Sequence, residues 1–371
     1  MPQVSSVQAA AEAMGRRKID QSILVGFDGF VDEIIHLVDE RQDADHFTRI
    51  NSMAAYGNRV ANAAGKSCNV EMVVNQMKLG GNGPIMGNSL QAQGYKIIYM
   101  GALGKERIHP VFEKFASNCF KVISCADPAH TDALEFLDGK VMMGKLQPLR
   151  DVNWTQLMTR VSLDEMRKII EEVSLVACTN WTMLPFMNSI LLGLNDVLGQ
   201  CREKKSVFVD LADPRKRTVV DIREVLELLG SMQKVADMLL GLNEDEATQI
   251  ARVLGVSTGL DLKALAADIR SKTGLHMVVI HPVKEAAVAT GDGAFWMGGP
   301  YTPVPKLTTG AGDNFNAGFC NGYLGGLPAE QCLATGVCAS GFYVRNGRSP
   351  QHQELVEFMK QWAAGNCGVI E

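Results

Sequence analysis

Residues 308–319 of this chain read TTGAGDNFNAGF. The two glycines that flank Ala311 let the backbone turn tightly and leave its N–H groups unobstructed. Phe315 and Phe319 follow one helical turn apart, so a helix is predicted to begin in this turn. Unpaired amides and the positive end of the helix dipole converge at such a start, which predicts an anion site. Asp313 adds a proton acceptor beside it, and together they have the layout of a phosphoryl-transfer site.

A GAGD turn at a helix start is, by itself, also an ordinary loop with an N-capping acid. The preceding Thr-Thr, the NFNAG continuation and the position late in the chain favour a functional site. With these neighbours the segment resembles the C-terminal signature of the ribokinase-like (PfkB-type) carbohydrate kinases. The resemblance implies that Gly310, Ala311 and Gly312 bind the charge that develops on the transferred phosphate. It also implies that Asp313 is the base that takes the proton from the sugar hydroxyl.

The composition excludes several other classes of protein. In 371 residues, 46% hydrophobic and 21% charged content is typical of a globular enzyme. A net charge of −5 argues against a nucleic-acid partner. The N-terminal segment lacks the apolar core of a signal peptide, and no later run reaches membrane-spanning length, so no membrane association is expected. The nine cysteines form no CxxC pair, which predicts reduced thiols in a cytoplasmic protein.

Short apolar runs alternate with helical patterns along most of the chain. This alternation predicts a mainly parallel central sheet with helices on both faces, and the resemblance implies the three-layer α/β/α ribokinase-like fold. The expected strands are residues 23–27, 97–100, 175–178, 206–210, 238–240 and 277–280. The expected helices are residues 85–93, 163–173, 221–233, 262–272, 313–325, 328–344 and 351–364.

Two stretches break this rhythm. Residues 33–79 contain runs that resemble strands more than helices, and residues 131–146 read as a hairpin with its turn at Asp138-Gly139. Both resemble the small β lid that ribokinase-like proteins carry over the sugar pocket. We therefore expect residues 1–371 to form a single kinase domain, with lid insertions at about 33–79 and 131–146.

Two aspartates follow the first predicted strand, residues 23–27. Ligands of open α/β sheets gather at the carboxyl ends of the strands, where a carboxylate can accept hydrogen bonds from two sugar hydroxyls. A turn aspartate beside glycine is the structural alternative. In the family an aspartate after the first strand binds the sugar, which makes Asp28 the leading candidate and Asp32 the second. Asn180 occupies a place where relatives contact sugar.

The segment GGNGP precedes a predicted helix and offers backbone amides together with one side-chain amide. It is similar to the double-glycine signature near the N-terminus of the family, which implies sugar contacts from Gly80, Gly81 and Asn82. The glycines could also be purely structural. Many members carry asparagine four positions after the second glycine, where this chain has Ile85.

Asn243 and Glu246 have the spacing that places two side chains on one face of a first helical turn. Such a pair can hold a hydrated Mg²⁺ that bridges nucleotide phosphates. The alternative is a capping box with Asn243 as the N-cap, and the local sequence does not distinguish the two. The Asn-x-x-Glu motif of the family lies between its two glycine signatures, as here, which favours the metal role. Asp210 begins a segment that resembles the family's Asp/Asn-Pro segment near the phosphates.

The resemblance also implies nucleotide contacts from Asn243, Thr309, Gly312 and His281. Relatives begin their adenine and ribose contacts with Thr and Gly where this chain has His281. Many relatives have aspartate before Thr-Thr-Gly, helping to hold a monovalent cation, whereas this chain has Leu307. Activation by potassium is therefore not carried over.

These features together predict an ATP-dependent kinase that uses Mg²⁺ and phosphorylates a hydroxyl of a sugar or sugar-like substrate. The alternatives are a nucleoside kinase of the same fold and a catalytically inactive sugar- or nucleotide-binding sensor. The expected partners are the sugar and ATP, and a homodimer formed through the lid is a family expectation.

Overall fold

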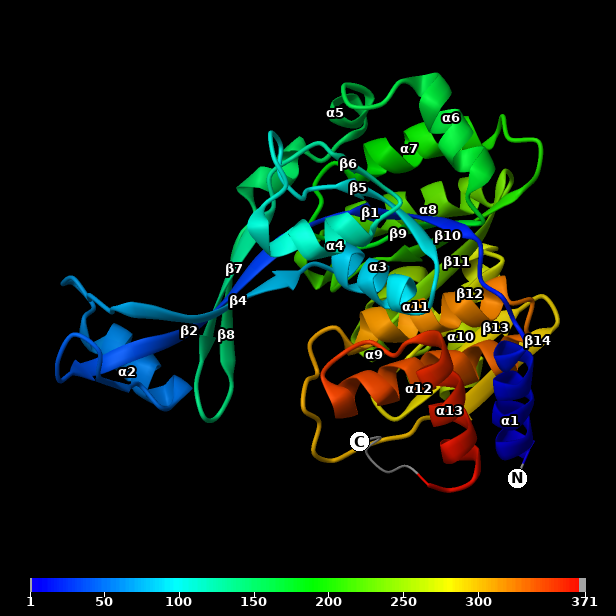
Figure 1. Cartoon of the computed structure of the whole chain (residues 1–371). Helices are drawn as coiled ribbons and strands as arrows, with labels where there is room; N and C mark the ends of the chain where they lie inside the picture. The colour runs from blue at the N-terminus through cyan, green and yellow to red at the C-terminus, as the bar shows by residue number, and fades with distance from the viewer. Residues whose placement is uncertain (1, 367–371) are drawn as a thin grey trace.

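For residues 2–366, which the computed structural model describes, the central element is a nine-stranded sheet (Figure 1). The strand order is β14-β13-β12-β11-β10-β9-β1-β5-β6. The strands β12, β11, β10, β9, β1, β5 and β6 run parallel to one another. At the β12 edge, β13 pairs antiparallel with β12, and β14 pairs antiparallel with β13. The strands are β1 Ser22–Phe27, β5 Lys96–Gly101, β6 Lys121–Ser124, β9 Leu175–Cys178, β10 Lys205–Asp210, β11 Ala236–Leu242, β12 Met277–Ile280, β13 Glu285–Thr290 and β14 Gly293–Gly298.

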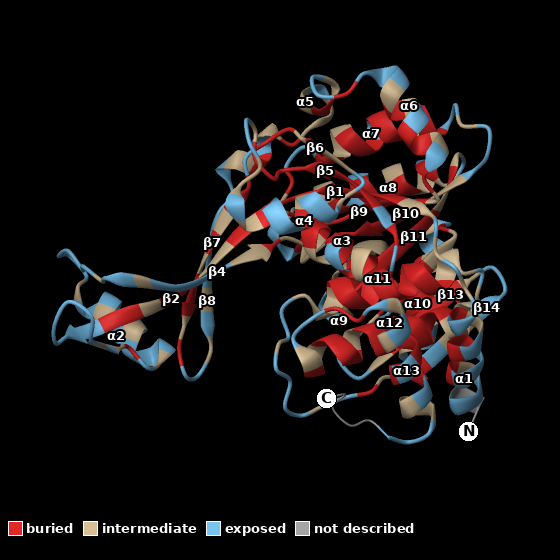
Figure 2. Cartoon of the chain, viewed as in Figure 1, coloured by how far each residue is buried: buried red, intermediate tan, exposed pale blue. Residues whose placement is uncertain are grey.

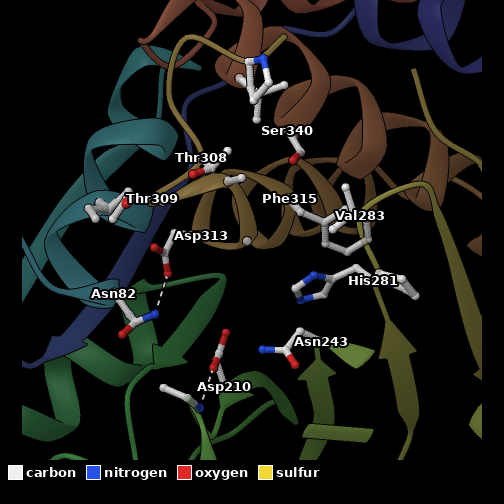
Figure 3. Close-up of a pocket in the computed structure, with 18 of the residues that line it drawn as sticks. Asn82, Asp210, Asn243, His281, Val283, Thr308, Thr309, Asp313, Phe315 and Ser340 are labelled. Carbon is white, nitrogen blue, oxygen red and sulfur yellow. Dashed lines mark hydrogen bonds between the residues drawn. The ribbon is translucent and has the colours of Figure 1, made fainter. Parts of the chain in front are cut away.

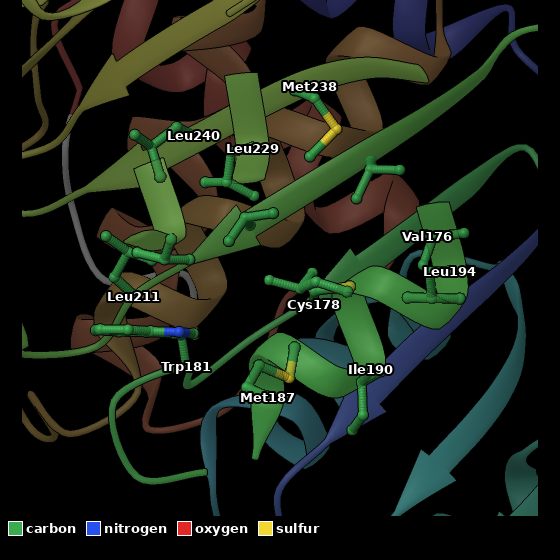
Figure 4. Close-up of a cluster of buried hydrophobic side chains, with 14 of the residues drawn as sticks. Val176, Cys178, Trp181, Met187, Ile190, Leu194, Leu211, Leu229, Met238 and Leu240 are labelled. Atoms are coloured by element: carbon green, nitrogen blue, oxygen red, sulfur yellow. The ribbon is translucent and has the colours of Figure 1, made fainter. Parts of the chain in front are cut away.

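Helices cover both faces of this sheet because alternate strand residues point to opposite sides. Leu24 belongs to one buried cluster, shown in part in Figure 4, whereas Ile23 and Val25 belong to the other. The first face is covered by α5 Trp154–Met158, α6 Leu163–Glu172, α7 Met187–Leu198, α8 Val219–Met232, α9 Glu244–Leu254 and α10 Leu262–Thr273. The second face is covered by α1 Pro2–Gly15, α3 Asn82–Ala92, α4 Glu113–Asn118, α11 Ala311–Leu324, α12 Ala329–Asn346 and α13 His352–Ala363. The three-layer prediction is confirmed.

A separate β lid projects from the main body (Figure 1). Strand β2 is its centre and pairs with β7, β3 and β4, while β8 pairs with β7. The lid consists of β2 Phe30–Arg41, β3 Phe47–Arg49, α2 Met53–Asn62, β4 Met72–Gly80, β7 Ala129–Glu135 and β8 Lys140–Lys145. Its strands begin at Phe30 and Ala129, slightly before the predicted insertions.

Most of the predicted elements are present, and the differences have local reasons. The lid contains the helix α2, where the sequence predicted only strands; Ser52 caps it, and the Tyr56 ring stacks on Phe136 of the lid. Helix α1 was not predicted because two of the buried residues on its described part are alanines, Ala10 and Ala11. The strands β6, β13 and β14, which lie at or next to the edges of the sheet, also escaped prediction, because they are short or rich in alanine and glycine.

No helix within residues 2–366 combines the length and the apolar character that crossing a bilayer requires.

Candidate active site

A cavity of about 840 Å³ lies at the carboxyl ends of the parallel strands, bounded by the lid and by helices α11 and α12 (Figure 3). All the predicted site residues except Asp28 and Gly80 line it. Those that do are Asp32, Gly81, Asn82, Asn180, Asn243, Glu246, His281, Thr309, Gly310, Ala311, Gly312 and Asp313. Residues from both glycine motifs therefore meet in one space, as expected for ligands at this edge of a parallel sheet.

The C-terminal glycine turn forms the start of α11. Gly310 is the N-cap with φ 90° and ψ 2°, a left-handed conformation that favours glycine. A Cβ added there would lie 2.9 Å from the Tyr343 hydroxyl, so the site also has no room for one. The Ala311 N–H donates to the Thr308 carbonyl at 3.1 Å. Among the described residues, the amides of Gly312 and Asp313 have no such backbone partner and are available to an anion.

Asp313 is buried in the first turn of α11, and Asn82 Nδ2 donates to its Oδ1 at 2.9 Å. This contact joins the two glycine motifs directly (Figure 3). Burial raises the pKa of Asp313 well above its ordinary value, and the nearby carboxylates of Asp210, Asp28 and Glu246 raise it further. A carboxylate with a raised pKa is a stronger proton acceptor once it is charged.

The lid contributes Asp32, a residue of strand β2, to the cavity wall. Burial raises its pKa, while a hydrogen bond with Thr131 and the charge of Lys78 lower it. The Asp32 carboxylate packs against Gly80, where an added Cβ would overlap it. Gly80 thus makes room for a carboxylate at the cavity wall without lining the cavity itself.

Asp28 lies behind the wall and does not line the cavity. Its side chain is fully buried and accepts hydrogen bonds from the backbone of Asn82 and Gly83 and from Asn180. The sequence analysis made Asp28 the leading sugar-binding candidate and Asp32 the second, but the two aspartates occupy different environments. Asp32 is placed to contact a ligand, whereas Asp28 contacts only the protein.

A third group of cavity residues consists of Asp210, Asn243 and Glu246. Asn243 and Glu246 form a complete capping box at the start of α9: the Glu246 N–H donates to Asn243 Oδ1 at 3.0 Å, and the Asn243 N–H donates to Glu246 Oε2 at 2.8 Å. The same two side chains line the cavity. Burial and the charge of Asp210 raise the pKa of Glu246 to about 8. Burial likewise raises the pKa of Asp210 to about 6.

His281 follows β12 and stacks on the Phe315 ring, with centroids 4.5 Å apart. Burial lowers its pKa to about 4, so the imidazole is neutral near pH 7. Its Nε2 atom has no hydrogen-bond partner within the part of the chain that the structure describes. Thr309 also lines the cavity, and its carbonyl accepts a bond of 2.7 Å from the Tyr343 hydroxyl.

Comparison with known proteins identifies the family of this chain. A family model described as prokaryotic ketohexokinase matches residues 3–362. The chain belongs to the prokaryotic ketohexokinase family. It is therefore a carbohydrate kinase, and the predicted ribokinase-like, PfkB-type relationship is confirmed. A ketohexokinase of Haloferax volcanii is 27% identical over 364 residues, which cover 96% of each chain.

Solved structures confirm the fold of this ketohexokinase-family member. A carbohydrate kinase from Agrobacterium tumefaciens superposes with a TM-score of 0.64 and 17% identity, over 92% of this chain and 97% of the other. The ribokinase of Arabidopsis thaliana, solved with ribose and ATP, has a TM-score of 0.65 and 17% identity, over 92% and 99%. A ribokinase from Cryptococcus neoformans, in complex with ADP, has a TM-score of 0.61 and 17% identity, over 91% and 99%.

Several cavity residues of this ketohexokinase-family chain were not foreseen. Their side chains are mostly apolar or neutral, so no motif marks them, and only the packing of the lid and of α12 brings them to the wall. At the lid end and beside Asn180 they are Phe30, Thr131, Met142 and Met183. At the α12 end they are Val337, Ser340, Gly341 and Val344.

Proposed function

We propose that this protein transfers the γ-phosphate of ATP to a hydroxyl group of a ketohexose. The observation that carries the proposal is the placement of Asp313. Its own N–H and that of Gly312 are available to an anion, and Asp313 lines the same cavity as Asp32 and Asn180. The family and the Haloferax volcanii relative support a ketohexose as acceptor. The ribokinases solved with ATP or ADP support ATP as donor.

In the proposed reaction the sugar lies between Asp32 of the lid and the turn that contains Gly81 and Asn82. Asn180 supplies a further amide at this end. The charged carboxylate of Asp313 takes the proton of the acceptor hydroxyl as its oxygen bonds to the γ-phosphorus. The bond from that phosphorus to the bridging oxygen breaks, and ADP leaves with the electron pair.

The amides of Gly312 and Asp313 are proposed to stabilise negative charge on the transferred group. They are fixed at the start of α11 before the reaction begins, so no reorganisation is needed when the charge develops. Closure of the lid over the sugar would exclude water and limit hydrolysis of ATP. His281, Thr309 and Asn243 would then face the nucleotide.

The experiment that tests this function is an acceptor panel. ADP release is measured with a ketohexose such as fructose, an aldohexose, ribose and a nucleoside. The proposal predicts the highest kcat/KM with the ketohexose. Preferential turnover of the nucleoside would favour a nucleoside kinase, and no ADP release with any acceptor would favour a non-catalytic sensor.

A magnesium ion would fit the group formed by Asp210, Asn243 and Glu246. Within residues 2–366 no cluster of three or more His, Cys, Asp or Glu side chains is arranged as a metal site, so the proposed ion would have to be held largely by water and phosphate. Asp210 and Glu246 are buried together with raised pKa values, so a nearby cation would relieve their repulsion. With Asn243 they would hold Mg²⁺, which supplies charge neutralisation to the phosphates.

Replacing Glu246 with glutamine is expected to raise the Mg²⁺ concentration for half-maximal activity by about tenfold. A second readout needs no turnover. Because the folded pKa of Glu246 is about 8 and its unfolded value is near 4.5, the folded state holds an extra proton between these pH values. Its contribution to stability therefore falls as pH rises through that window. As pH rises through this window, the Tm of the ligand-free protein should therefore fall less in Glu246→Gln than in wild type.

The matched control is Glu354→Gln, which alters the same kind of capping box at the start of α13, far in sequence from the acidic group. It should leave the Mg²⁺ requirement unchanged. An unchanged Mg²⁺ requirement in Glu246→Gln would contradict the metal role and leave Glu246 as a helix cap.

The lid carries exposed apolar side chains, which is where a second copy of the chain would dock in the proposed homodimer. They include Met72, Val74, Met77, Leu137, Met142 and Met143. We expect sedimentation to show a dimer, and Val74→Asp on β4 to shift it toward monomer. A wild-type protein that is monomeric at micromolar concentration would contradict this proposal.

A further inference from the structure

Asp28 is a fully buried carboxylate at the junction of three segments. It follows β1, and its oxygens accept from donors on two other segments. The Asn82 N–H donates to Oδ2 at 2.9 Å, and the Gly83 N–H donates to Oδ1 at 2.8 Å. Asn180 Nδ2 donates to Oδ2 at 2.6 Å. No apolar group of this shape could satisfy these N–H groups.

Two of the three donor residues line the cavity itself. Asn82 also points its side chain at Asp313, so the orientation of the turn decides where that contact falls. Asn180 has a left-handed backbone with φ 60°, and its Oδ1 accepts from the Met183 N–H at 3.3 Å. Its Nδ2 bond to Asp28 therefore fixes which edge of the amide faces the cavity.

The turn is packed closely around this carboxylate. Gly81 has φ 98°, and a Cβ built on it would lie 3.1 Å from Asp28 Oδ2. A Cβ on Gly83 would lie 2.9 Å from Oδ1. The second glycine of the N-terminal motif and the glycine after Asn82 thus allow the backbone to approach Asp28.

We infer that Asp28 is a positioning residue of the sugar pocket, which holds Asn82 and Asn180 in the orientation that binds the acceptor. The inference rests on the proposed function, because it assigns Asp28 an effect on the sugar and not on the nucleotide. Asparagine has nearly the same shape but offers one acceptor oxygen. In Asp28→Asn at least one of the three contacts would therefore bring two donors face to face.

The charge of Asp28 makes the role visible in a pH profile. Burial raises its pKa to about 6, against the three hydrogen bonds, which lower it. The titratable groups that face it are Tyr99 of β5, whose hydroxyl donates to the Asp28 carbonyl, and Asp313 of α11. Burial raises the pKa of Tyr99 well above its ordinary value, so it stays neutral. Below about pH 6, a proton on Asp28 would displace one of the N–H donors.

This loss of binding would not be a loss of fold. Because the folded pKa of Asp28 lies above the ordinary value of 3.8, its protonation favours the folded state as pH falls through that interval. Sugar affinity and the contribution of Asp28 to stability therefore change in opposite directions. A merely structural role would not produce this combination.

The test measures KM for ketohexose, KM for ATP, kcat and Tm of Asp28→Asn between pH 5 and pH 8. We expect the sugar KM to rise by about tenfold, which corresponds to the loss of one buried hydrogen bond. The ATP KM should stay within about twofold of wild type. In wild type the sugar KM should rise as pH falls through about 6, and in the variant this step should be absent. Asp221→Asn, in the capping box of α8, is the matched control.

A variant that changes only Tm, with wild-type sugar KM and pH profile, would overturn the inference. If the variant does not fold, a wild-type sugar KM that is flat from pH 5 to pH 8 would overturn it instead. If wild type phosphorylates no sugar, the proposed function fails. Calorimetric titration of the same proteins with ketohexose then still tests whether Asp28 positions a sugar site.

Discussion

Replacing Asp313 with asparagine is expected to lower kcat by roughly 10²–10⁴-fold, the usual contribution of a general base. Asparagine keeps an oxygen that can accept from Asn82, so the join between the two glycine motifs survives. It lacks the negative charge that takes the proton. The dissociation constants for ATP and ketohexose, measured by calorimetry, should therefore stay within a few-fold of wild type.

The control for this variant is Asp261→Asn. Asp261 is also an acid at a helix start, where it accepts from the Ala264 N–H at 2.9 Å, but it does not line the cavity. Its kcat should equal that of wild type. A loss of ketohexose binding in Asp313→Asn equal to the loss of kcat/KM would show that Asp313 binds the sugar and does not act as the base.

Replacing Gly310 with alanine should lower kcat by about 10²-fold, the effect of losing one preorganised donor at a developing charge. The added Cβ would meet the Tyr343 hydroxyl and Ile85, and Tyr343 is held by its bond to Thr309. The turn would have to shift, which moves the amides of Gly312 and Asp313. Steady-state kinetics with saturating ATP and ketohexose measure the effect.

Gly255→Ala separates this displacement from simple backbone strain. Gly255 also has a positive φ, 68°, but no atom lies within 4 Å of a Cβ built there. Its alanine variant should lose some Tm and keep its kcat. Equal losses of kcat in the two variants would contradict an anion site at the Gly310 turn.

The central sheet could be predicted from sequence because its inner strands are short, continuous apolar runs buried on both faces. Residues 175–178 and 277–280 coincide with β9 and β12 to the residue. The edge strands β6 and β14 lack this pattern, since each has a neighbouring strand on one side alone and most of its residues are not buried. β6, for example, has one buried residue in four.

The candidate site was predictable where a motif carries the chemistry in its own backbone. The turn from Gly310 to Asp313 needs only local residues to form a helix start with available amides. Asp28 and Asp32 could not be told apart in this way. The pairing of β2 with β4 and β7 decides that Asp32, opposite Thr131, faces the cavity.

The Asn243–Glu246 pair shows a second limit of prediction from the sequence. Its sequence fits both a capping box and a metal ligand pair, and the structure contains the box at the cavity wall. The two roles are compatible because the box uses Glu246 to satisfy backbone N–H groups while its carboxylate stays next to Asp210. No local pattern could reveal that proximity, since Asp210 ends strand β10 and Glu246 lies in helix α9.

The most direct test of the account is ketohexose-dependent ADP formation by wild type and Asp313→Asn, measured side by side at saturating substrate concentrations. The account predicts one ADP for each phosphorylated ketohexose in wild type, and a rate at least about 10²-fold lower in the variant. Equal rates in the two proteins, or ADP formation by wild type that does not depend on a ketohexose, would contradict it.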